Sequence, residues 1–187
     1  MRTTILLFII SIIIVYGGLL LPQTLLIEQK IEINSSSSHI SEYLYDLPQW
    51  EKWINWQEWK PTSDTKAIYS QFPQGVGAFM KFEENNTEKA ELYIQSISNT
   101  NTDFQKLKYI ANFKTLQTHV EGEFEVQSKF ENDEHSTLNF TLQIDLGENP
   151  FMRYLGYLYY KSKIETETNK SLERLKKICE NPVFCKK

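Results

Sequence analysis

Between residues 66 and 146 the chain carries six short segments in which apolar and polar residues alternate. Residues 120–126 are the clearest case, because Val, Gly, Phe and Val alternate there with three glutamates. A period of two places successive side chains on opposite faces of a strand, so we expect the glutamates to face solvent. We predict strands over residues 66–72, 78–82, 90–95, 104–113, 120–126 and 138–146. The short turns between them imply an antiparallel meander with one apolar face.

A long amphipathic helix is predicted after the sixth segment. Residues 147–150 introduce it, and Pro150 suits a first helical turn. Its apolar line comprises Tyr157, Tyr159 or Tyr160, Ile164, Thr168, Ser171 or Leu172, Leu175 and Ile178. Charged residues take the other faces, namely Lys161, Lys163, Glu165, Glu167, Lys170, Glu173 and Lys176. A sheet and a helix that each have one apolar side would bury those sides against each other.

A strand, a short helix and a tryptophan cluster precede the meander. The strand spans residues 25–33, and the serines that follow can cap a helix that starts near Ser38. That helix has an apolar face and ends before Pro48. All four tryptophans then fall within residues 50–59. Tryptophans suit core packing and the wall of a ligand cavity alike, so both interpretations stay open.

Three runs of sequence carry a family resemblance. They are N-S-S-S-S-H-I-S-E-Y-L-Y-D-L-P-Q-W-E-K-W-I-N-W from Asn34, G-V-G-A-F-M-K-F from Gly75 and F-M-R-Y-L-G-Y-L-Y-Y from Phe151. Over about residues 25–180 the chain resembles the SRPBCC or START-like superfamily, in particular its polyketide cyclase/dehydrase and lipid-transport-like members. The resemblance implies an α+β helix-grip fold, START or Bet v 1-like. In that fold a curved antiparallel sheet wraps around a long C-terminal helix, and a cavity lies between them.

The predicted ligand is therefore a lipid or another small hydrophobic molecule. Small side chains at Gly122, Thr168 and Ser171 are consistent with room for it. The residues predicted to contact the ligand are Trp50, Trp53, Leu92, Ile94, Leu107, Tyr109, Phe124, Phe140, Tyr157 and Ile164.

The N-terminus is almost continuously apolar from Ile5 to Leu21. A helix from Thr3 to Leu21 would be about 28 Å long, close to the ~30 Å hydrocarbon thickness of a bilayer. A cleaved signal peptide would need a small-x-small cleavage site, which Val15 and Gly17 offer only weakly. We expect residues 1–23 to be an uncleaved transmembrane signal anchor that contacts the bilayer through residues 4–21. Residues 24–180 would form the helix-grip domain, and 181–187 a C-terminal tail.

The predicted topology places the domain outside the cytoplasm. Arg2 and the amino terminus precede the apolar run and Lys30 is the one nearby cation after it, which slightly favours a cytoplasmic N-terminus. Cys179 and Cys185 are the only cysteines, and the intervening Asn-Pro can turn the chain back. They are predicted to form a disulfide, as in oxidising compartments, with two reduced cysteines as the alternative.

Composition excludes some functions. A net charge of -4 without a basic block argues against nucleic-acid binding. No Cys/His cluster has metal-ligand spacing, no G-x-S-x-G occurs, and the three histidines fall in positions that favour solvent exposure. We expect no metal, no cofactor and no catalytic residue. Two alternatives remain: a cyclase/dehydrase-like enzyme that uses Tyr93, Tyr109 or Asp46, and an envelope interaction protein with a vestigial pocket.

Overall fold

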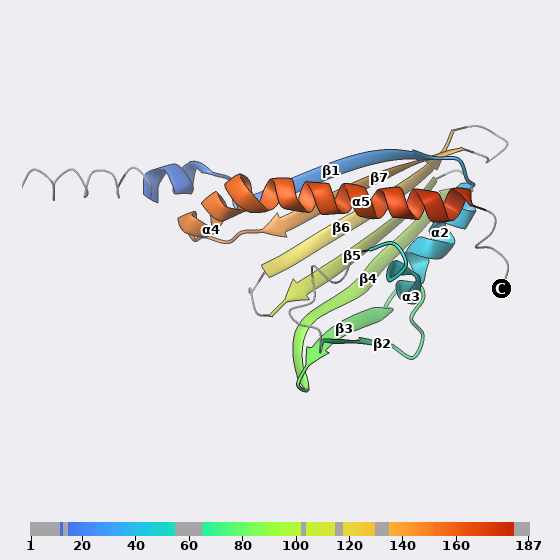
Figure 1. Cartoon of the computed structure of the whole chain (residues 1–187), viewed down its shortest axis with the longest axis horizontal. Helices are drawn as coiled ribbons and strands as arrows, with labels where there is room; N and C mark the ends of the chain where they lie inside the picture. Colours follow the sequence, from blue (N-terminus) through green and yellow to red (C-terminus); the bar gives the residue numbers. More distant parts are fainter. Residues whose placement is uncertain are drawn as a thin grey trace, which may run out of the picture.

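The computed structural model describes residues 12, 15–54, 65–101, 104–114, 118–129 and 135–181. A single seven-stranded antiparallel sheet dominates it, with the order β1-β7-β6-β5-β4-β3-β2 (Figure 1). The strands are β1 (Thr24–Ile33), β2 (Lys66–Tyr69), β3 (Phe79–Glu84), β4 (Thr87–Asn101), β5 (Phe104–Phe113), β6 (Thr118–Ser128) and β7 (Ser136–Asp145). Strands β2 to β7 form the predicted meander, and β1 closes the other edge by pairing with β7.

Alternation along the strands sets which face of the sheet is buried. In β1, Leu25, Ile27, Ile31 and Ile33 are buried and the residues between them are mostly exposed. Strand β4 is longer than predicted, and its register against β5 shifts between Ile94 and Ser96. Such irregularities bend a strand, and β4 curves strongly in Figure 1. The bend helps the sheet to curl around the helix.

Two short helices follow β1: the predicted one, α2 (Ser37–Tyr45), and a second, α3 (Leu47–Trp50), which leads into the tryptophan cluster. The Ser36 hydroxyl caps α2 by accepting a hydrogen bond from the His39 amide at 3.2 Å. Asp46 is extended, so α2 ends and the chain enters α3 in a new direction. Ile40, Leu44 and Leu47 are buried, which places both helices against the apolar face of the sheet.

The C-terminal helix has three parts: α4 (Pro150–Leu155), the π-helical segment η2 (Gly156–Tyr160) and α5 (Lys161–Glu180). Its buried residues in α5 are Ser171, Leu172, Leu175 and Cys179. Of the two tyrosines left open for the apolar line, Tyr159 is 61% exposed, whereas Tyr160 lines a cavity beside the sheet. A π-helical segment has more residues per turn than an α-helix, so a spacing count based on 3.6 residues fails across η2.

Helix α5 lies across the sheet and runs along β1 (Figure 1). The Gln29 amide nitrogen donates to the Glu165 carbonyl at 3.0 Å, and the Asn34 amide donates to the Glu180 carboxylate at 2.8 Å. Sheet and helix together match the predicted helix-grip arrangement.

The predicted membrane span falls mainly on residues outside the described part of the chain. Within that part, no helix is both long enough and apolar enough to cross a bilayer. Cys179 is buried, but Cys185 and nearly all of the predicted tail lie outside the described residues. The anchor and the disulfide therefore stay predictions.

Candidate functional site

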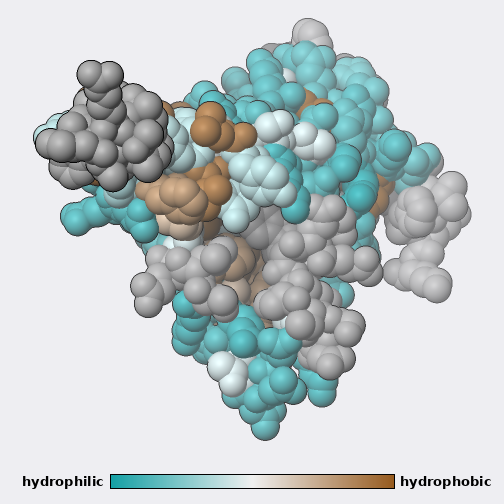
Figure 2. Space-filling model, turned by 60° about the vertical axis from the view of Figure 1, so that its left-hand side comes forward, coloured by the Kyte–Doolittle hydropathy of each residue, from teal (hydrophilic) through white to brown (hydrophobic). Residues whose placement is uncertain are grey.

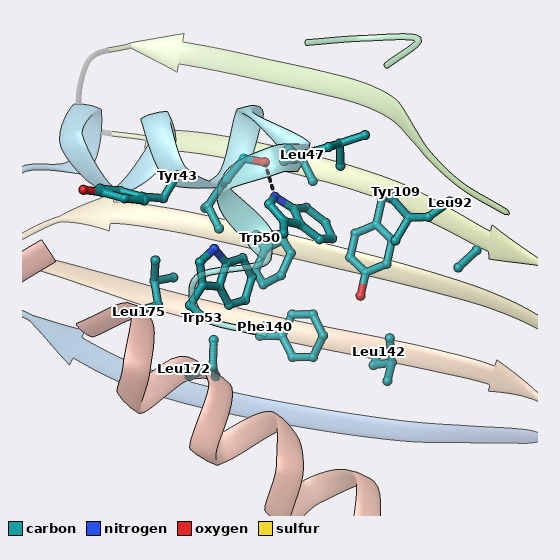
Figure 3. Packing of buried hydrophobic residues seen from close by; sticks show 14 of the residues in the cluster. Tyr43, Leu47, Trp50, Trp53, Leu92, Tyr109, Phe140, Leu142, Leu172 and Leu175 are labelled. Atoms are coloured by element: carbon teal, nitrogen blue, oxygen red, sulfur yellow. Dashed lines mark hydrogen bonds between the residues drawn. The ribbon is translucent and has the colours of Figure 1, made fainter. Parts of the chain in front are cut away.

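An aromatic cluster stands where α3 meets the sheet (Figure 3). Trp50 and Trp53 are 0% and 2% exposed, with ring centroids 5.5 Å apart. The Trp50 ring meets Tyr109 and Phe124 edge-on at 5.2 and 5.7 Å, and the Trp50 indole nitrogen donates to the Leu44 carbonyl at 2.9 Å. These two tryptophans are packed in the core, and the same rings also form part of a cavity wall.

The cavity beside this cluster is the inner chamber. It lies between the sheet and the middle of α5 and has a volume of about 80 Å³. Its wall is almost entirely apolar. The residues that line it are Trp50, Trp53, Ile54, Leu92, Tyr109, Ala111, Phe113, Val120, Phe124, Phe140, Leu142, Glu167, Thr168, Ser171 and Leu172.

A larger outer chamber adjoins it toward α4, with a volume of about 260 Å³. Its lining consists of Leu25, Phe113, Thr118, Val120, Ile144, Leu146, Met152, Tyr160, Lys163, Ile164 and Glu167. Phe113, Val120 and Glu167 line both chambers, so the two volumes follow one another along the helix. The outer volume approaches the lower end of the range for small-molecule pockets, about 300 Å³.

Glu167 is the one carboxylate among the described residues that line the chambers. The Lys170 ammonium lies 2.6 Å from it and holds the pKa of Glu167 below its ordinary value. The prediction that Glu167 lies away from the apolar line is wrong. Its position three residues after Ile164 and four before Ser171 was the available signal, because such spacings share a helix face.

Tyr109 and Gly122 face each other across β5 and β6. A methyl group at Gly122 would lie only 2.0 Å from the Tyr109 ring carbon Cζ, so the ring lies over the glycine. The space at Gly122 that we assigned to a ligand is therefore filled by Tyr109. Burial raises the pKa of the Tyr109 hydroxyl above its ordinary value.

The ten predicted contact residues fall into three groups. Six line the inner chamber: Trp50, Trp53, Leu92, Tyr109, Phe124 and Phe140. Ile164 lines the outer chamber. Ile94 and Leu107 are each 1% exposed and pack in the core away from both linings, and the Tyr157 hydroxyl donates to the Thr24 carbonyl at 2.9 Å.

The three residues considered for proton transfer do not come together. Tyr109 lines the inner chamber, whereas Tyr93 is half-buried between the buried Leu92 and Ile94 and so faces the other side of the sheet. Asp46 accepts a hydrogen bond from the Gln49 amide at 3.2 Å and bridges to Gln74, away from both linings. Among the described residues, no group of three or more His, Cys, Asp or Glu is placed to hold a metal ion.

Neither a protein-family model nor a curated protein matches this chain. Solved structures do match. A hypothetical protein of Helicobacter pylori has a TM-score of 0.60 at 10% identity, over 83% of this chain and 88% of its own. Norcoclaurine synthase of Thalictrum flavum, in complex with dopamine and hydroxybenzaldehyde, has a TM-score of 0.54 at 12% identity, over 83% and 86%. These are Bet v 1-like folds of the SRPBCC type, which confirms the predicted fold.

Proposed function

We propose that this chain binds a lipid acyl chain, or a similarly apolar small molecule, in the two chambers between the sheet and α5. The observation that carries the proposal is the adjoining pair of chambers with a nearly continuous apolar lining. A wall of this kind favours apolar ligands because contact with it removes their surface from water.

Two polar features support a ligand with a polar group. The Trp53 indole nitrogen is buried and has no hydrogen-bond acceptor among the residues that the structure describes. Glu167 brings a charged carboxylate to the point where the chambers meet. A buried donor without a partner is costly, so an oxygen of a ligand or a water would stabilise the loaded site.

Quenching of tryptophan fluorescence by a brominated fatty acid tests this proposal, because Trp50 and Trp53 line the inner chamber. The full chain in nanodiscs is titrated alongside two variants. Thr168→Phe fills the inner chamber, whereas Thr166→Phe changes an exposed residue on the same helix. We expect saturable quenching in the unchanged protein and in Thr166→Phe, with a marked loss in Thr168→Phe. Equal quenching in all three would contradict binding in the chamber.

The proposal includes tethering to a membrane through residues 4–21, supported by their apolar sequence. The full chain should stay with the membrane fraction after an alkaline wash. A variant with Ile10→Lys and Ile13→Lys should be released, because charges in the middle of a span disfavour insertion. Release of the unchanged chain would count against the tether.

A further inference from the structure

The chain just before β1 is docked closely on α4. Residues 15–20 form a helical turn in which Gly17 and Gly18 face the start of the C-terminal helix. A methyl group at Gly17 would lie 2.2 Å from the Tyr154 hydroxyl oxygen, and one at Gly18 would lie 2.6 Å from Pro150 Cβ. Only glycines allow so close an approach.

Arg153 holds the same junction from inside. Its side chain is buried, and its guanidinium donates to the carbonyls of Leu19 at 3.2 Å and Leu21 at 3.1 Å and to that of Gly147 at 3.0 Å. The carbonyls of Leu19 and Leu21 end the helical turn, where a positive charge is favourable. The turn is therefore fixed to the domain. The orientation of the turn then sets how the domain is oriented relative to the chain that precedes it.

Large apolar side chains are exposed on the adjoining helix surface. Phe151, Leu158 and Tyr159 are 64%, 80% and 61% exposed, and all three lie within the stretch formed by α4 and η2. We name these three residues the α4–η2 face. Tyr16, Leu19 and Leu20 are exposed on the docked turn. Figure 2, with this end of the molecule turned forward, shows hydrophobic surface gathered there among largely hydrophilic surroundings.

The outer chamber reaches the same end of the molecule. Met152 and Tyr160, the direct neighbours of Phe151 and Tyr159, line that chamber. Lys161 and Lys163 follow at the start of α5. Lysines beside an exposed apolar surface can extend their ammonium groups to lipid headgroups.

We propose that the α4–η2 face lies in the interface of the bilayer that the apolar run before the docked turn enters, so that the outer chamber opens toward lipid. This inference rests on the tether in the proposed function. The bilayer is the occupant that the structure favours, because the apolar run leads directly into the docked turn beside this face. Tyrosine also suits an interface that is apolar on one side and wet on the other, and phenylalanine and leucine suit its apolar side.

Fluorescence quenching at defined positions tests the inference. An environment-sensitive fluorescent amino acid replaces Leu158 in one full-length chain and the exposed Thr166 in another, and each is reconstituted into vesicles of phosphatidylcholine and phosphatidylglycerol. Spin-labelled lipid should quench the probe at 158 several-fold more than the probe at 166, and aqueous iodide should show the reverse order. Iodide access at 158 equal to that at 166 would overturn the inference. So would protection of 158 from both quenchers, which would indicate a protein partner.

A second measurement separates this inference from the proposed function. Leu158→Glu should slow uptake of the brominated fatty acid from vesicles several-fold while uptake from dilute solution stays unchanged, with Thr166→Glu as the matched control. Equal slowing from both sources, or from neither, would overturn the inference. If the unchanged protein takes up no ligand from either source, the proposed function fails, and the probes at 158 and 166 still decide whether this face meets the bilayer.

Discussion

The contact between Tyr109 and Gly122 decides how the inner chamber is shaped. Gly122→Ala should lower the free energy of unfolding by about 1–3 kcal/mol, because the buried ring must move to admit the methyl group. Urea unfolding measures the loss. The displaced ring should also change ligand uptake, since Tyr109 lines the chamber.

A double-mutant cycle isolates this contact. In a Tyr109→Ala background the ring is absent, so Gly122→Ala should cost much less than it does in the unchanged protein. The same cost in both backgrounds would mean that the clash with Tyr109 is not the cause.

Tyr109 also predicts a pH dependence at the scale of one residue. Burial raises the pKa of its hydroxyl in the folded state above the ordinary value of 10.0. The folded state then holds a proton that the unfolded state releases, so the stabilisation is complete below about pH 10 and is lost as the pH rises through the folded pKa.

The measurement is the free energy of unfolding against pH, alongside the near-ultraviolet absorbance of tyrosinate. Tyr109→Phe should show a smaller loss of stability above about pH 10. Tyr69→Phe is a useful comparison, because burial and the Glu51 carboxylate also raise the pKa of Tyr69. An unchanged alkaline slope in Tyr109→Phe would contradict the prediction.

At the scale of elements, periodicity predicted the strands and the long helix, whereas the helix-grip arrangement was implied by the family resemblance. The bounds predicted for β5 agree with those observed, and the serine cap of α2 and its end before α3 were also predicted. Alternation reports which face a residue occupies but not which residue lies across from it, so the filling of the Gly122 space by Tyr109 could not be foreseen. The role of Arg153 was missed for a similar reason, because two of its three acceptors, Leu19 and Leu21, lie more than 130 positions away in the sequence. The lone arginine within an aromatic run was the available signal.

The hydrogen bonds of Arg153 are predicted to stabilise the contact between the N-terminal turn and α4. Arg153→Met removes the donor to three carbonyls, so the backbone amides of residues 16–21 should exchange with deuterium faster. Hydrogen bonds from charged groups contribute about 1.5–3 kcal/mol each, so acceleration of at least tenfold is expected.

Arg153→Lys is the matched control for charge. It keeps the cation but cannot direct separate donors at Gly147, Leu19 and Leu21, so it should restore only part of the protection. Full protection in Arg153→Met would show that the glycine contacts alone hold the turn.

Helix α5 is hydrogen-bonded to the chain of β1 near both of its ends and borders the chambers in between. Along β1, hydrogen bonds from Gln29 and Asn34 secure α5 at Glu165 and Glu180. Between these two points, Glu167 and the buried Leu172 border the chambers. The hydrogen bonds near β1 thus hold α5 in place against the sheet. In the proposed function, a ligand would enter the chambers without separating the helix from the sheet.

Empty chambers should lower the free energy of unfolding, because the side chains that line an unfilled volume lack packing contacts on that side. Ser171 is 8% exposed and lines the inner chamber, so Ser171→Leu should fill part of that volume. The variant should gain about 1 kcal/mol and melt a few degrees higher, yet lose quenching by the brominated fatty acid. Thr166→Leu, on the exposed side of α5, should change neither melting nor quenching. A lower melting temperature for Ser171→Leu would mean that the leucine overpacks its site and that the chamber is closed in solution. A higher melting temperature together with lost binding would identify space that the fold keeps open for its ligand.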